Sequence, residues 1–172
     1  ILLGVPLLAL TYRRFPLTPL AYRLIFLHAL ILMVGAHSTY ALVPLGDWAR
    51  DFFHLSRNPY DRLGHFAQGF VPAVLAREVL LRRTPLRSGK WLSFLTLFVC
   101  MTISVFCEFT EWWTALIGGD AADAFLGSQG DGWDTQWDMF MCLVGASTAL
   151  LTLPRLHDWE MKKLAKVRRA VE

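Results

Sequence analysis

Three pairs of acidic and histidine side chains stand at helical spacing in an otherwise apolar chain. The pairs are Asp61 with His65, Glu108 with Glu111, and Asp134 with Asp138. Residues three or four apart share one face of a helix, so the members of each pair point the same way. Carboxylates and imidazoles from facing helices build the metal sites of helical bundles. We therefore predict a divalent-metal site, and its candidate ligands are Asp61, His65, Glu108, Asp134 and Asp138.

A metal held in this way would activate water for attack on a lipid-linked or other envelope substrate. The candidate catalytic residues on this hypothesis are Asp61, Glu108 and Glu111, and a divalent metal is the cofactor that the pattern implies. Two other functions remain open. The same carboxylates would carry a proton or cation in a transporter, or would lock helices together in an accessory subunit of a larger membrane complex.

Each acidic residue also has a simpler explanation. Asp61 and Asp134 stand where helices are expected to begin, so either could be only an N-cap. Glu108 is harder to explain structurally, because it lies between Cys107 and Phe109 in an apolar run and charge inside a membrane is costly. The sequence contains no HExxH, CxxC or P-loop pattern, so the metal prediction rests on spacing alone.

Hydropathy predicts the helices that must position these residues. The chain has 172 residues, of which 55% are hydrophobic and 18% charged, and its apolar segments have the length of roughly 17–25 residues that spans a bilayer. The predicted fold is all-α: a polytopic transmembrane helix bundle over residues 1–154, with five visible spans and a sixth in the full protein. The spans are expected at residues 1–10, 20–43, 60–81, 91–117 and 134–153, the first of them truncated, with connections at 47–59 and 118–132.

Basic residues indicate which segments are cytoplasmic. The connection after the third span is basic, and residues 155–172 form a basic amphipathic tail, whereas residues 118–132 carry three Asp and no base. Strict alternation then places all three pairs near the outer face. We expect side-chain atoms of His65, Glu108 and Asp138 to lie roughly 3–6 Å apart, within reach of one shared ligand.

The charge pattern also predicts location and partners. We expect a multi-pass protein of the bacterial inner membrane with a cytoplasmic C-terminus, in contact with bilayer lipids and, as an accessory subunit, with other membrane proteins. Nucleic acid is not expected as a partner, because the basic residues flank apolar segments. Beyond Arg77 and Glu78 the cytoplasmic halves of the spans carry few polar side chains, which argues against a transporter, and His157 is expected at the membrane interface.

Several motifs resemble those of a known family. Residues 57–66, 108–112, 127–131 and 133–139 resemble the YjdF-type inner-membrane proteins, a likeness that extends from about residue 35 to 146. The order of Asp61, His65, Glu108 and Asp138, with Gly145 after it, is more loosely similar to VanZ-like proteins, which are linked to glycopeptide-antibiotic resistance. Those proteins commonly have Asn where Cys142 stands here. The resemblance implies an inner-membrane location and supports the same candidate residues, but it implies no substrate.

Overall fold

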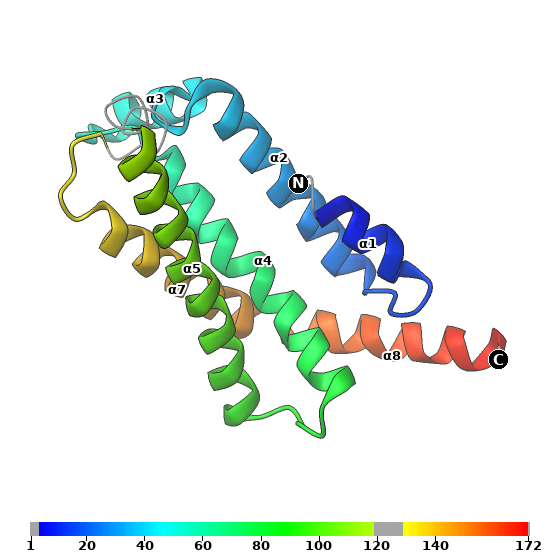
Figure 1. Ribbon diagram of the computed structural model, residues 1–172. Coiled ribbons are helices and arrows are strands. Elements are labelled where there is room, and N and C mark those ends of the chain that lie inside the picture. Colours follow the sequence, from blue (N-terminus) through cyan, green and yellow to red (C-terminus); the bar gives the residue numbers. More distant parts are fainter. Residues whose placement is uncertain (1–3, 119–128, 172) are drawn as a thin grey trace.

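The computed structural model describes residues 4–118 and 129–171, without the side chains of 168–171. These residues form seven α-helices and one short 3-10 helix, and the described part of the chain contains no β-strand (Figure 1). The elements are α1 (Gly4–Tyr12), α2 (Pro19–Ser38), η1 (Tyr40–Leu42), α3 (Pro44–Phe53), α4 (Tyr60–Arg83), α5 (Lys90–Gly118), α7 (Asp134–Thr152) and α8 (Pro154–Val171). The predicted all-α fold is confirmed, and the helix boundaries lie close to the predicted ones for α4, α5 and α7.

Helix α4 is the centre of the bundle and packs against α7, α5 and α2. Its closest neighbour is α7, because glycine lets the two backbones touch. A Cβ on Gly69 would overlap the carbonyl of Cys142, and a Cβ on Gly145 would overlap the carbonyl of Phe66. Gly69 and Cys142 each follow a predicted metal ligand by four residues, His65 and Asp138 respectively, so this contact helps to set the distance between the two ligands.

Among the described residues, fewer helices than the five predicted spans are long and apolar enough to cross a membrane. Two helices, α2 and α5, are long and apolar enough to cross a membrane, and α7 with α8 would count as a third span if the bent pair were taken as one. Helix α4 does not qualify, because charged residues at both of its ends lower its hydropathy while much of its length is buried inside the bundle. The described helices therefore do not confirm five spans.

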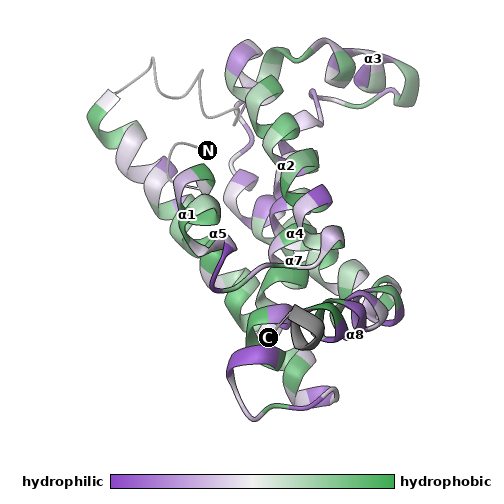
Figure 2. Cartoon of the chain, turned by 90° about the vertical axis from the view of Figure 1, so that its right-hand side faces the viewer, coloured by the Kyte–Doolittle hydropathy of each residue, from purple (hydrophilic) through white to green (hydrophobic). Residues whose placement is uncertain are grey.

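Apolar side chains lie both on the outer surface of this bundle and in a buried core. Figure 2 shows apolar residues over much of α2 and α5, and large side chains such as Phe26, Phe98 and Phe106 are exposed there, as expected of helices that face lipid. A small buried core lies between the ends of the bundle. It consists of Leu20, Ala21, Ala73, Val74, Cys100, Cys142, Ala146 and Ala149.

Two predicted boundaries were wrong. Helix α2 ends at Ser38 rather than at residue 43, because Thr39 takes a positive φ of 51° and the chain continues into a 3-10 turn. The expected polar connection at 47–59 contains the amphipathic helix α3, which begins at Pro44 and is braced by an Arg50–Asp47 ion pair of 2.7 Å. The predicted acidic loop lies largely outside the described residues, including its Asp120 and Asp123.

Candidate metal centre

Four carboxylates from three helices surround the imidazole of His65, and we call these five side chains the His65 cluster: Asp61 and His65 on α4, Glu108 and Glu111 on α5, and Asp138 on α7. His65 Nε2 lies 3.7 Å from Asp61 Oδ1, 3.9 Å from Glu111 Oε1 and 3.9 Å from Asp138 Oδ2. His65 Nδ1 lies 3.7 Å from Glu108 Oε1. These separations are too long for hydrogen bonds. The structure thus brings together residues that are up to 77 positions apart (Asp61 to Asp138).

The cluster is buried and incompletely hydrogen-bonded. His65 is 5% exposed and Asp138 1%, while the Glu111 side chain is the most accessible of the five at 33%. His65 Nδ1, Glu108 Oε1 and Asp138 Oδ1 have no hydrogen-bond partner among the described residues. Buried polar atoms in proteins nearly always have a partner, and leaving one without costs free energy. Three such atoms on three helices indicate a position for a bound ion or water.

Two ligand sets meet at His65. One set is Asp61, His65 and Asp138, the other is His65, Glu108 and Glu111, and the ligand atoms in each set lie within 4.8 Å of one another. Two ligand atoms on one tetrahedral zinc-like ion stand about 3.4 Å apart, since each bond is about 2.1 Å long. Small side-chain movements would therefore close either set around a cation. A mixed imidazole and carboxylate set suits zinc, manganese or iron better than magnesium.

Asp134, the remaining predicted ligand, lies in neither set. It forms an ion pair with Arg57, whose guanidinium also lies 3.9 Å from Asp61 Oδ2 and 3.3 Å from Asp131 Oδ2. Arg62 pairs with the same Asp131 at 2.9 Å. The arginines thus connect the edge of the His65 cluster to the residues that precede α7. The N-cap explanation is not supported, because Pro59 occupies the N-cap of α4 and Trp133 that of α7.

Side-chain and backbone contacts hold the segments before α4 and α7 together. Asn58 and Gln129 bind each other reciprocally: the Asn58 N–H donates to Gln129 Oε1 and Gln129 Nε2 donates to the Asn58 carbonyl, both at 3.0 Å. A hydrogen bond from the Trp133 backbone N–H, with Arg57 and Arg62 nearby, lowers the pKa of Asp131 and favours its ionised form. Sequence reasoning did not place Asn58, Gln129 or Asp131 among the site residues, although all three lie in the family-like motifs.

A cavity of about 320 Å³ adjoins the cluster. Asp61, His65 and Glu111 line it, and the remaining lining residues come from α2, η1, α4 and α5: Leu32, Ala36, Tyr40, Gly64, Gln68, Cys107, Thr110 and Thr114. Its wall is polar towards α4 and apolar towards α2. Glu108 and Asp138 are not among the lining residues.

A second buried ionisable cluster lies at the other end of α4, and we call it the Glu78 cluster: Thr18, Arg77, Glu78, Arg82 and His157. The Glu78 carboxylate, 0% exposed, accepts hydrogen bonds from Thr18 N at 3.1 Å and Thr18 Oγ1 at 2.8 Å, and also from Arg82. Arg77 Nη1 lies 3.1 Å from His157 Nδ1 and can only donate, so His157 donates from Nε2 to Glu78, at 3.1 Å. In contrast to the His65 cluster, every carboxylate oxygen here is used.

Sequence analysis did not predict the burial of His157. This residue, which was expected at the membrane interface, lies in the first turn of α8, is only 1% exposed and contacts Glu78 of α4. The sequence did contain one sign of a buried polar cluster here: Arg77 and Glu78 stand side by side in an apolar segment, and a buried charge needs a partner. The partner could not be identified from sequence, since it lies 79 positions away beyond a bend.

Comparisons with known proteins agree with this membrane architecture. Residues 1–159 match a family model described as "Predicted membrane protein (DUF2238)". The chain is 52% identical over 167 residues to "Inner membrane protein YjdF" of Escherichia coli (strain K12), a match that covers 97% of this chain and 80% of that protein. No solved structure matches. The predicted likeness to YjdF-type proteins is confirmed, the likeness to VanZ-like proteins stays a prediction, and the chain belongs to the DUF2238 family of predicted membrane proteins.

Proposed function

We propose that this membrane protein holds a divalent cation in the His65 cluster and uses it to act on a lipid-linked or other envelope substrate. The observation that carries the proposal is the set of unpartnered, buried atoms His65 Nδ1, Glu108 Oε1 and Asp138 Oδ1 around one imidazole. A purely structural network would satisfy its own hydrogen bonds, as the Glu78 cluster does.

The local charge favours a cation. Four carboxylates lie within 4 Å of one imidazole, and Arg57, whose guanidinium lies 3.9 Å from Asp61, also pairs with Asp131 and Asp134. Several buried negative charges repel one another unless protons or a cation neutralise them. A divalent ion would neutralise two of them and would supply the missing partners of the orphaned atoms.

The cavity gives the cluster access to a substrate. A bound cation would supply Lewis-acid chemistry and an acidified water. Glu111 lines the cavity and is the most accessible carboxylate, so we assign it to accept a proton there. Asp61 and His65 also line the cavity, whereas Glu108 and Asp138, which do not, each complete one of the two ligand sets. The apolar wall from Leu32 and Ala36 on α2 fits a substrate with a lipid part.

We further propose that the His65 cluster lies at the outer face of the membrane and that α8 lies at the cytoplasmic face. The support is the excess of Arg and Lys in residues 82–90, where α4 ends and α5 begins, and in α8. A cysteine at Gly130 should then react with an impermeant thiol reagent added to intact cells, and a cysteine at Ser88 should not. The reverse labelling pattern would contradict this orientation.

A proton- or cation-coupled transporter is the second candidate, and the Glu78 cluster is the observation that favours it. Ionisable residues lie at both ends of α4, whereas sequence analysis expected few of them at the end that holds the Glu78 cluster. However, the buried core with Ala73, Val74 and Cys142 lies between the two clusters. His65 and Glu78 are 13 residues apart, which is about 20 Å along a helix, so the two clusters do not form one continuous polar path.

The experiment that tests the proposal compares two buried glutamates. The wild-type protein in detergent should gain thermal stability when zinc or manganese is added, by about 2.7 kcal/mol at a hundredfold excess over Kd. Glu108→Gln keeps the side-chain shape but should abolish this gain. Glu160→Gln, which changes a buried glutamate outside the cluster, should keep it. An equal response of both variants to the metal would refute the proposed ligand set.

A further inference from the structure

Helix α8 buries two polar side chains and exposes large apolar ones beside its basic residues. His157 and Glu160 are buried, whereas Leu156, Val167 and Trp159, which is 58% exposed, lie on the outside. Large apolar side chains exposed beside basic ones are typical of a helix that lies at a membrane surface. The outer side of α8 therefore offers both apolar contacts and positive charge.

Specific contacts fix this orientation of α8. The Glu160 carboxylate accepts a hydrogen bond of 2.6 Å from the Leu20 N–H at the start of α2. Asp158 accepts one of 2.7 Å from Arg77, and His157 contacts Glu78 at 3.1 Å. Turning α8 about its axis would break all three contacts, so its apolar side chains cannot exchange places with the buried polar ones.

Lysines accompany the exposed apolar face. Lys162, Lys163 and Lys166 follow Trp159 by three, four and seven residues, which places them on the same side of the helix. All three are exposed, and Lys163 Nζ lies 5.4 Å from the centre of the Trp159 ring. Trp and Lys side chains at one level are typical of the membrane–water interface, where the ammonium groups reach the lipid phosphates.

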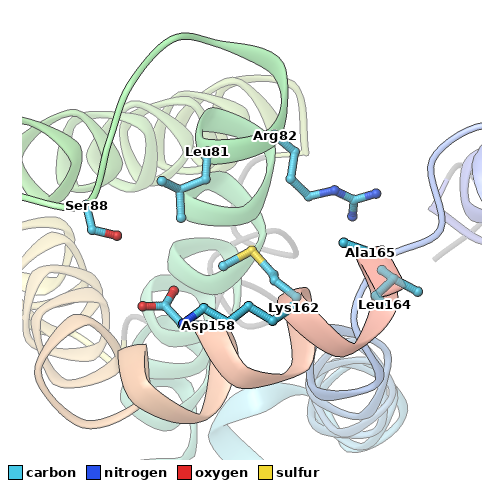
Figure 3. A pocket seen from close by; sticks show the side chains of 8 residues that line it. Leu81, Arg82, Ser88, Asp158, Lys162, Leu164 and Ala165 are labelled. Carbon is cyan, nitrogen blue, oxygen red and sulfur yellow. The ribbon is translucent and has the colours of Figure 1, made fainter. Parts of the chain in front are cut away.

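Two hollows adjoin these lysines and share Lys162. The first, of about 470 Å³, is lined by Trp159, Lys162, Lys163, Ala165 and Lys166. The second, of about 840 Å³, lies between α8 and the end of α4. Figure 3 shows Asp158, Lys162 and Ala165 of α8 on one side of this second hollow and Leu81 and Arg82 of α4 on the other.

Lys162 is the cation in the second hollow that remains available to a ligand. Arg82 is engaged by Glu78 and by the Pro16 carbonyl at 2.8 Å, and Asp158 is neutralised by Arg77. Lys162 forms no ion pair with any side chain that the structure describes. An incoming anion would therefore meet an unneutralised positive charge beside the apolar side chains of Met161 and Leu164.

We propose that α8 is a binding site for an anionic phospholipid. The headgroup phosphate binds Lys162, Lys163 and Lys166, and the acyl chains contact Leu156, Trp159 and Val167 on the exposed face. Positive charge on the lysines matches the phosphate, and the outward apolar face matches the chains. The attraction of a basic residue to an anionic bilayer surface corresponds to about fivefold in affinity per lysine.

The test uses the purified full chain in detergent and counts bound lipids by native mass spectrometry. Dioleoyl-phosphatidylglycerol should remain bound at concentrations at which dioleoyl-phosphatidylcholine and free glycerol 3-phosphate do not. The triple variant K162Q/K163Q/K166Q should lose about a hundredfold in phosphatidylglycerol affinity. The triple variant with arginine at the same positions should retain binding, because it keeps the charge.

A matched control separates a specific site from overall charge. R13Q/R14Q/R87Q removes the same number of exposed positive charges elsewhere and should bind phosphatidylglycerol as the wild type does. Equal loss in both triple variants would overturn the site in favour of diffuse electrostatic attraction. Tight binding of glycerol 3-phosphate would overturn the lipid as ligand, and equal retention of phosphatidylcholine would overturn the role of the lysines. Thermal unfolding of each variant checks that the lysine variants are folded.

Discussion

The two ends of α4 bury similar residue types in opposite states of hydrogen bonding. At one end Glu78 accepts hydrogen bonds from Thr18, Arg82 and His157, among them one of 2.8 Å from Thr18 Oγ1. At the other end the imidazole of His65 stands 3.7–3.9 Å from four carboxylates, and three buried atoms have no partner among the described residues. A satisfied network stabilises a fold, whereas an unsatisfied one is a place for a ligand.

The two clusters also differ in what they can do: one holds helices in place, and the other can bind a ligand. The Glu78 cluster joins the starts of α2 and α8 to the end of α4, so it positions elements that are distant in sequence. In the His65 cluster, the imidazole on α4 approaches the carboxylates on α5 and α7 only across gaps that a cation or water would fill. Burial and residue type alone would have classed the two clusters together, and the hydrogen bonds distinguish them.

The largest expected effect is the loss of the Glu78 carboxylate. Glu78→Leu leaves His157 and the Thr18 N–H buried without their acceptor and removes one of the two acceptors of Arg82, so we expect the free energy of unfolding to fall by about 3–5 kcal/mol. Asp138→Asn, measured in chelator, should change it little, because Asp138 Oδ1 has no partner to lose. Reversible unfolding in detergent measures both. Equal destabilisation by the two variants would remove the distinction between the clusters.

A medium effect is expected where α4 and α7 touch. Gly69→Ala places a methyl group against the Cys142 carbonyl, so we expect overpacking to reduce the free energy of unfolding by about 1–3 kcal/mol. The separation of the helices should also change the spacing of His65 and Asp138, and metal affinity should fall. The control is Gly132→Ala, which adds a methyl group with no heavy atom within 4 Å. If Gly69→Ala bound metal as tightly as Gly132→Ala, the close approach would not be setting the site.

The smallest expected effect concerns Asp131, outside the clusters. Because its pKa is lowered in the folded protein, its ionised form adds stability above the pKa of the unfolded chain, and this contribution is lost as pH falls through the lowered pKa. The wild type should therefore have a slightly higher melting temperature than Asp131→Asn at neutral pH, and the gap should close in acid. A gap that stays constant with pH would show that the ion pairs with Arg57 and Arg62 add no stability.

Helical spacing predicted much of the His65 cluster. Pairs three and four residues apart, on helices that alternate in direction, brought Asp61, His65, Glu108, Glu111 and Asp138 to one depth, because a regular helix converts sequence distance into height. Asp134 is also at the expected height, but it forms an ion pair with Arg57 and does not belong to either ligand set around His65. Spacing specifies height, whereas the rotation of each helix depends on packing such as that at Gly69.

The Glu78 cluster could not be predicted in the same way. Its members come from the segment before α2, the end of α4 and the start of α8, and the 65° bend between α7 and α8 brings His157 to Glu78. Pro154 indicated that a helix stops there, but the direction of the next helix is set by tertiary contacts. Helix α3 was not predicted, because its charged residues are also typical of a polar loop. The structure shows that Asp47 and Arg50 form an ion pair three residues apart on a helix.

Elemental analysis of the protein purified without chelator tests whether the His65 cluster binds a metal. We expect stoichiometric divalent metal in the wild type and in Glu160→Gln, and its loss in Asp138→Asn and Glu108→Gln, since these two remove ligands of the His65 cluster. Wild-type protein without metal, which also fails to take up zinc or manganese when they are added, would contradict the account and would leave the cluster as a site of shared protons.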